Sequence, residues 1–160
     1  MSAPMTASAK LAEMGIVLPK VATAAGSYLP TMRTGNLIFT SGQLPFQDGK
    51  LAGLGKVGAE VTAEEANGYA KICALNVLAA LDAAVGIDNV VRVVKVVGFV
   101  ASADGFTGQP GVINGVSDFF VEVFGDNGRH ARSAVGVAEL PLGAPVEVEA
   151  IVEVRAVETH

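Results

Sequence analysis

Cysteine, histidine and tryptophan are nearly absent from this chain of 160 residues. Cys73 is the single cysteine, so no disulfide can form within the chain. His130 and His160 are the two histidines, and with one cysteine they give no ligand set of the kind that zinc requires. The sequence therefore predicts neither an internal disulfide nor a bound metal.

Positive charge is also scarce. The chain has 11 lysines and arginines and 16 aspartates and glutamates, so its net charge is −5. The lysines and arginines form no cluster, whereas a nucleic-acid-binding surface needs a basic stripe. We therefore expect no nucleic-acid partner.

Long uninterrupted hydrophobic runs are missing too. The most apolar run, "VVRVVKVVGFVA" at 90–101, contains Arg92 and Lys95 and is too short to span a bilayer. The N-terminus lacks a charged start, a long apolar core and a cleavage site, so it does not resemble a secretory signal. We expect a soluble, cytoplasmic protein with no membrane partner.

The composition that remains is that of a globular protein, with 51% apolar and 17% charged residues. The length suits one domain, so residues 1–160 are expected to form a single domain. Residues 6–14 predict a short helix that ends before Gly15, which makes residues 1–20 an N-terminal extension with a short helix.

The clearest expected helix covers residues 63–85. Thr62 and Glu65 have the spacing of a capping box, and Gly86 follows the last apolar residue. Cys73 lies on the apolar face of this helix. It is expected to be a small buried side chain, because a nucleophilic thiol would need a polarising partner that the sequence does not offer.

Strands are expected at four places. A hairpin turns at Gly35–Asn36, and residues 90–101 form a central strand that is apolar on both faces. Residues 130–154 predict two strands joined by a short Pro/Gly loop as a hairpin of undetermined register. Residues 46–60 are glycine-rich and predict a surface loop with at most a short strand.

A second helix is expected to begin at Pro110 and to end by Gly128. The order of elements predicts an α+β fold with two helices packed on one face of a mixed sheet. The other face of strand 90–101 is equally apolar, and no further long helix remains to cover it. We therefore expect a closed homo-oligomer.

Arg132 stands among small residues in "HARSAVGV". The two-residue period of a strand places Ala134 and Gly136 on the same face, which leaves room beside a guanidinium that can hold a carboxylate with two hydrogen bonds. The alternative is an ion pair between Arg132 and a glutamate across the sheet or a subunit interface. The residues alone leave both open.

Two further polar segments allow a site but do not require one. Glu147 and Glu149 share a strand face, which is either solvated or contains one carboxylate that activates water, and the spacing does not choose between the two residues. Ser41 and Gly42 offer a hydroxyl and a backbone N–H that either hold an anion or simply form a turn. The sequence has no phosphate-binding loop, dinucleotide motif or nucleophile elbow.

Four segments together resemble one known family. They are "GSY" at 26–28, "GNLIFTSGQLP" at 35–45, "ARSAVGVAELP" at 131–141 and "VEVEAIVEV" at 146–154. These segments are similar to motifs of the RidA/YjgF family of reactive-intermediate deaminases, also known as the endoribonuclease L-PSP family. The resemblance extends over most of the chain, and its last two segments are the most specific.

The resemblance implies a chorismate-mutase-like fold and a homotrimer with ligand clefts between subunits. It implies hydrolytic deamination of enamine and imine acids of the 2-aminoacrylate type to 2-keto acids and ammonia, with no cofactor. In that reaction Arg132 would hold the substrate carboxylate and Glu147 would orient or activate water. The implied substrate-binding positions are Tyr28, Ser41, Gly42 and Ala134.

Three features depart from the family pattern. Ala134 stands where many relatives have cysteine, the loop at 46–60 is long and glycine-rich, and both Asn114 and Ser117 compete for the position of a family asparagine. The alternative function is therefore a non-catalytic trimeric protein that binds small carboxylates in the same cleft. A third function, RNA cleavage or inhibition of translation, is disfavoured by the acidic composition.

Overall fold

The helices and strands follow the order that the sequence predicts, with one additional pair of short strands. In the computed structural model, which describes residues 5–21 and 26–157, the elements are α1 (Ala7–Glu13), β1 (Thr31–Thr34), β2 (Leu37–Thr40), β3 (Phe46–Gln47), β4 (Lys50–Leu51), α2 (Ala63–Val85), β5 (Val90–Ala101), α3 (Gln109–Phe124), β6 (Ala131–Val137) and β7 (Val146–Val154). Three 3-10 turns connect the later elements, namely η1 (Ile87–Asn89), η2 (Gly125–Gly128) and η3 (Pro141–Gly143).

The longest helix, α2, begins and ends as the sequence predicts. Thr62 Oγ1 accepts a hydrogen bond from the Glu65 N–H, and the Glu65 carboxylate accepts one from the Thr62 N–H. Gly86 ends the helix at φ 80°, a conformation that glycine adopts without strain. By length and composition α2 could cross a membrane, but 50% of its most apolar stretch is buried inside the molecule. Such burial is typical of a core helix.

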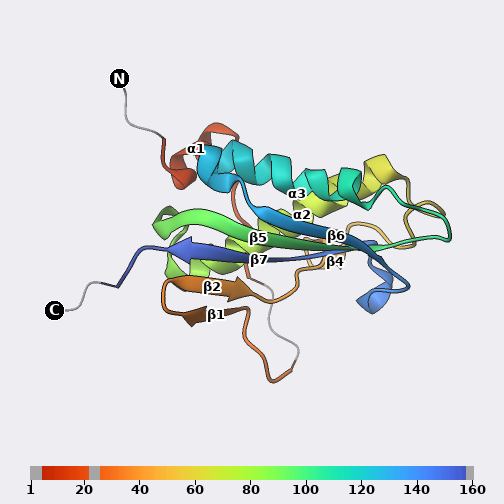
Figure 1. Ribbon diagram of the computed structural model, residues 1–160, viewed down its shortest axis with the longest axis horizontal. Helices are drawn as coiled ribbons and strands as arrows, with labels where there is room; N and C mark the ends of the chain where they lie inside the picture. Colours follow the sequence, from red (N-terminus) through yellow and green to blue (C-terminus); the bar gives the residue numbers. More distant parts are fainter. Residues whose placement is uncertain (1–4, 22–25, 158–160) are drawn as a thin grey trace.

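The five-stranded sheet has the order β1-β2-β7-β5-β6, with β6 parallel to β5 and the other neighbours antiparallel (Figure 1). The hairpin at Gly35–Asn36 is confirmed, because β1 and β2 pair across that turn. The expected hairpin of the last two strands is wrong, because β5 lies between them. Along β7 buried and half-buried residues alternate, as in a central strand, whereas β6 has exposed residues at an edge of the sheet.

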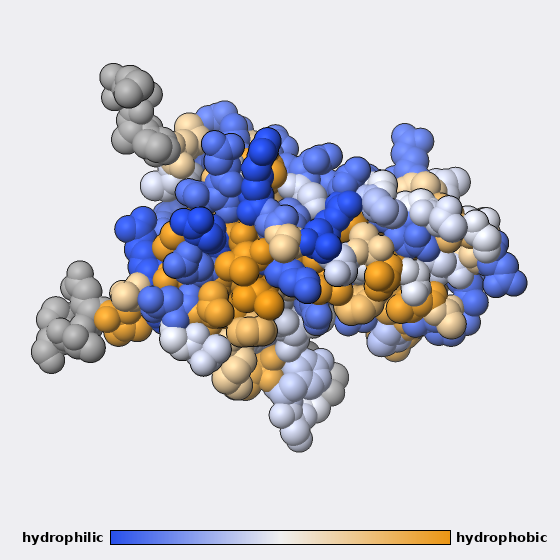
Figure 2. Space-filling view, in the orientation of Figure 1, coloured by the Kyte–Doolittle hydropathy of each residue, from blue (hydrophilic) through white to orange (hydrophobic). Residues whose placement is uncertain are grey.

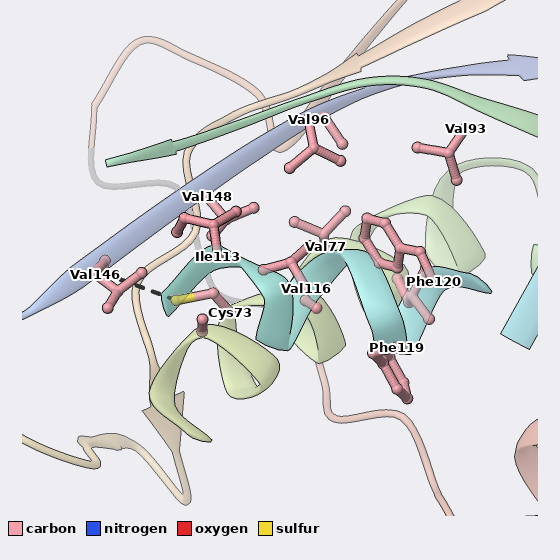
Figure 3. Packing of buried hydrophobic residues seen from close by; sticks show 14 of the residues in the cluster. Cys73, Val77, Val93, Val96, Ile113, Val116, Phe119, Phe120, Val146 and Val148 are labelled. Carbon is pink, nitrogen blue, oxygen red and sulfur yellow. Dashed lines mark hydrogen bonds between the residues drawn. The ribbon is translucent and has the colours of Figure 1, made fainter. Parts of the chain in front are cut away.

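The core lies between the sheet and the helices α2 and α3, with α1 packed at one end against α3 and η1. Val116 of α3 belongs to this core together with Val96 of β5 and Val148 of β7 (Figure 3). Each fully buried side chain of this kind contributes about 1.5–3 kcal/mol. Cys73 is fully buried in the same cluster, with its Sγ 3.8 Å from the Val146 carbonyl oxygen, and burial raises the pKa of its thiol. The expectation of a small buried side chain at Cys73 is confirmed.

The helices α2 and α3 lie close together at Gly115. A Cβ added there would collide with the backbone oxygen of Asn67, which cannot move aside without shifting α2. We expect Gly115→Ala to lower the free energy of unfolding by about 1–3 kcal/mol, although alanine has the higher helix propensity. Denaturant unfolding measures the effect, with Gly68→Ala as the matched control.

Gly68 lies inside α2 with nothing within 4 Å of an added Cβ. The control variant should therefore be stabilised by up to about 1 kcal/mol through helix propensity alone. If both variants gain stability, the two helices do not pack as closely as described.

The opposite face of the sheet carries no helix among the described residues, and it presents apolar side chains as well as Glu147 and Glu149. Figure 2 shows hydrophobic side chains gathered over the middle of this face, with hydrophilic side chains around them. The strand register places a group of five apolar side chains on it, which we call the apolar sheet face. They are Phe39, Val97, Phe99, Val135 and Ile151.

The glycine-rich segment 46–60 differs from the expected surface loop. β3 and β4 pair as a small hairpin, and Val57 beyond them is fully buried. The Val57 N–H donates to the Ala101 carbonyl oxygen at 2.8 Å, which joins the segment to the end of β5. The burial of Val57 was not predicted from the sequence, because the many glycines around it suggest exposed turns.

Candidate functional site

A cleft of about 950 Å³ opens beside β7 and the end of β2. Four of the six predicted site residues line it, and they come from segments far apart in the sequence. These four are Tyr28, Ser41, Gly42 and Glu147. The volume is ample for a small organic acid.

Glu147 is the carboxylate of this cleft. The alternation of β7 directs Val146 and Val148 toward the helices and Glu147 to the opposite side of the sheet. Burial, and then the negative charge of Glu149, raise the pKa of Glu147. Glu147 lines the cleft, whereas Glu149 does not.

Gly42 gives the Glu147 carboxylate its space. A Cβ added at Gly42 would collide with Glu147 Oε2 and lie within 2.9 Å of its Cδ. Any larger residue here would displace the Glu147 carboxylate, so the glycine allows the carboxylate to lie against the turn that ends β2.

The side chains of Ser41 and Asn76 form hydrogen bonds to the backbone of segments that line the cleft. The Ser41 hydroxyl donates to the Leu29 carbonyl oxygen at 2.5 Å, which fixes the segment next to Tyr28. Asn76 is buried on α2, and its Nδ2 donates to the carbonyl oxygens of Leu44 and Phe46, each at 3.0 Å. Asn76 was not among the predicted site residues, although an asparagine among the apolar residues of a helix is a signal that the sequence offers.

Arg132 lies elsewhere, on the helix side of the edge strand β6. Its Nη1 donates to Asn114 Oδ1 at 2.8 Å and to Ser117 Oγ at 3.2 Å, and both residues belong to α3. Asn114 and Ser117 therefore both contact Arg132, and neither of them lines the cleft that contains Glu147. Within the described part of the chain Arg132 forms no ion pair, so a glutamate partner across the sheet is excluded. A glutamate partner across a subunit interface stays the alternative.

Ala134 lies two residues beyond Arg132 on the same face of β6. It pairs with Gly98 of β5 and packs partly against the core. Gly98 beside it leaves space for α3, because a Cβ added at Gly98 would collide with the Ile113 side chain.

The predicted site residues thus form two groups that one chain does not bring together. Arg132 and Ala134 face the helices from the edge strand, whereas Glu147 faces the other side of the sheet two strands away. Neither Arg132 nor Ala134 lines the cleft of Glu147. A small substrate that needs both Arg132 and Glu147 therefore needs a second copy of the chain.

His130 was not predicted as a site residue, yet it contacts the Arg132 group. Its Nε2 lies 2.8 Å from Ser117 Oγ, and its Nδ1 lies 2.6 Å from the Gly128 carbonyl oxygen. Its position directly before "ARS" was the only signal in the sequence. Among residues 5–21 and 26–157 no group of histidine, cysteine, aspartate or glutamate side chains could hold a metal ion.

The raised pKa of Glu147 predicts how activity depends on pH. The ionised carboxylate is the form that accepts a proton. The rate of the expected deamination should therefore fall on acidification as the pH passes through the pKa of Glu147, which lies above the ordinary 4.5. Glu149→Gln removes the nearby negative charge that raises this pKa, so it should move the acid limb of the pH–rate profile to lower pH. An unmoved limb would show that Glu149 does not act on the titrating group.

Glu153→Gln is the matched control for that experiment. Glu153 lies further along the same face of β7 but forms an ion pair with Arg92 at 2.9 Å, and its charge is not among the causes that shift the pKa of Glu147. Its pH–rate profile should coincide with that of the wild type.

The fold is the α+β fold of chorismate-mutase-like proteins, and comparisons with known proteins agree. The sequence model of the family described as "YjgF/chorismate mutase-like, putative endoribonuclease" matches residues 8–154. Protein TCP17 of Trypanosoma cruzi is 46% identical over 150 residues, which cover 92% of this chain and 94% of that protein. The chain belongs to the YjgF/chorismate mutase-like family, as its motifs predict.

Solved structures give the same result. The crystal structure of Atu1372 from Agrobacterium tumefaciens, a protein of unknown function, matches with a TM-score of 0.85 at 45% identity over 91% of each chain. The structure of E. coli TdcF with bound serine matches with a TM-score of 0.62 at 26% identity, covering 86% of this chain and 94% of that chain.

Proposed function

We propose that this protein hydrolyses enamine and imine acids of the 2-aminoacrylate type to 2-keto acids and ammonia. The observation that carries the proposal is the state of Arg132, whose two partners are neutral and leave its charge available for a carboxylate. The bound serine of TdcF supports a small amino-acid-like ligand for this fold. The reaction requires no cofactor, and a cytoplasmic location would suit substrates that decay quickly in water.

Each step of the reaction uses few groups. The enamine tautomerises to the imine while Arg132 holds its carboxylate. Glu147 accepts a proton from water as the water oxygen bonds to the imine carbon, and it passes this proton to the nitrogen, which gives a carbinolamine. Glu147 then transfers the hydroxyl proton of the carbinolamine to the nitrogen as the carbon–nitrogen bond breaks and the keto group forms. Water and the imine give a keto acid and ammonia, so atoms and charge balance. Since imines hydrolyse without a catalyst, positioning of water supplies most of the acceleration.

The active site is proposed to form between copies of the chain. Arg132 and Ala134 of one copy would complete the cleft that contains Glu147, Tyr28 and Gly42 of another. The uncovered apolar sheet face supports such an assembly, because a surface of this kind is usually buried by a partner. A homotrimer is the closed assembly that the family resemblance implies.

A binding protein without turnover is the second candidate, and Ala134 in place of the common cysteine favours it. The two functions are separated by coupling the purified protein to a serine or threonine dehydratase and measuring keto-acid release. Accelerated release supports the deaminase. A rate equal to that without the protein, together with tight binding of a keto acid, supports the binding protein.

A further inference from the structure

Ser117 and His130 form a hydrogen-bonded pair beside Arg132 for which the proposed reaction has no role. Ser117 lies on α3, one turn after Asn114, and His130 lies directly before β6. The Ser117 Oγ is 2.8 Å from His130 Nε2 and 3.2 Å from Arg132 Nη1, so the serine hydroxyl connects the imidazole to the guanidinium.

The direction of these hydrogen bonds follows from the Gly128 carbonyl. That oxygen only accepts, so the His130 Nδ1 carries the proton and donates across 2.6 Å. The Nε2 of a neutral imidazole is then an acceptor, and the Ser117 hydroxyl donates to it. With its proton engaged, the Ser117 oxygen presents lone pairs to Arg132.

The Gly128 carbonyl is itself held in place. Gly128 is buried against the end of α3, where an added Cβ would collide with the backbone oxygen of Phe120 and lie 2.9 Å from the Val121 Cα. The His130 ring also packs edge to face on Phe120, with 6.2 Å between the ring centroids. The imidazole therefore has a fixed position and a fixed tautomer.

These hydrogen bonds determine which edge of the Arg132 guanidinium remains open. Its Nη1 has two hydrogens, and Asn114 Oδ1 and Ser117 Oγ occupy both. Among the described residues no hydrogen bond or ion pair engages Nε or Nη2, which lie side by side on the remaining edge of the planar guanidinium. This edge has the spacing of a carboxylate and can bind it with two parallel hydrogen bonds.

We propose that His130 is a positioning residue that, through Ser117, holds the Arg132 guanidinium with its Nε and Nη2 edge toward the substrate carboxylate. This inference rests on the proposed function, in which Arg132 binds that carboxylate. Burial first, and then the charge of Arg132, lower the pKa of His130 and favour the neutral acceptor form, while the Gly128 hydrogen bond acts in the opposite direction.

Two substitutions at His130 test the inference. His130→Phe keeps an aromatic ring against Phe120 but has no acceptor for the Ser117 hydroxyl, whereas His130→Gln places an amide oxygen near the position of Nε2. Binding of pyruvate is measured by calorimetry, and kcat and KM are measured in the dehydratase-coupled assay. We expect His130→Phe to raise the Kd for pyruvate and the KM about tenfold with little change in kcat, and His130→Gln to recover most of this loss.

Ser117→Ala breaks the same connection from the other side. Its Kd for pyruvate should rise about as much as that of His130→Phe, and the double variant should be no weaker than either single variant. Thermal unfolding shows that each variant is folded.

Wild-type pyruvate affinity in His130→Phe overturns the inference, as does a His130→Gln variant that is as weak as His130→Phe. Failure of the wild type to bind pyruvate overturns it too, because Arg132 then does not bind a carboxylate. If the wild type binds pyruvate but does not accelerate keto-acid release, the deaminase proposal fails, while the comparison of the variants still decides the role of His130.

Discussion

Arg132→Ala is expected to abolish turnover of 2-aminoacrylate-type substrates and to raise the Kd for a small keto acid at least about 100-fold, or about 2.7 kcal/mol. The guanidinium is the only group assigned to the substrate carboxylate, and charge-assisted hydrogen bonds are the strongest that the site can offer. Calorimetry with pyruvate and the dehydratase-coupled assay measure the two effects.

The substitution should leave the fold intact, because Arg132 is only half-buried and its partners Asn114 and Ser117 remain open to water. Arg129→Ala is the matched control, since it removes an exposed positive charge three residues away. It should bind pyruvate as the wild type does. Unfolding or dissociation of Arg132→Ala would assign the arginine a structural role instead.

Glu147→Gln is expected to lower kcat by about 10²–10⁴-fold while the Kd for pyruvate changes little. The amide has nearly the shape of the carboxylate and keeps its place against Gly42, but it cannot accept the proton of the attacking water. Steady-state kinetics combined with calorimetry separate the loss of chemistry from a loss of binding.

Glu149→Gln is the matched control at neutral pH, because it removes the neighbouring charge on the same strand without changing the cleft. It should retain most of the kcat of the wild type. If Glu147→Gln keeps full activity and Glu149→Gln loses it, the activation of water belongs to Glu149.

The helices and the β1–β2 hairpin could be predicted because their signals are local. The capping box at Thr62, the turn at Gly35–Asn36 and the apolar face of α3 each lie within a few residues of chain. The pairing of the last strands could not, because a short Pro/Gly loop is equally compatible with a hairpin and with a connection across β5. The buried Val57 was missed since surrounding glycines suggested an exposed loop.

The candidate site was predictable as a set of residues and not as an arrangement. The family motifs indicated Arg132 and Glu147. Their placement on opposite sides of the sheet follows from the pairing register, and their separation by two strands follows from the strand order. Asn76 and His130 carry no motif, and their positions follow from tertiary contacts with Leu44 and Ser117. Only the folded chain reveals them.

The central claim is that Arg132 of one copy and Glu147 of another act on the same substrate. The most direct test mixes the inactive variants Arg132→Ala and Glu147→Gln as unfolded chains in equal amounts, refolds them together and measures keto-acid release. Random assembly of closed oligomers gives intact sites at about one quarter of positions, so activity should return to about a quarter of the wild-type value. If the mixture stays as inactive as each variant refolded alone, the two residues do not share a site between copies, and the account is wrong.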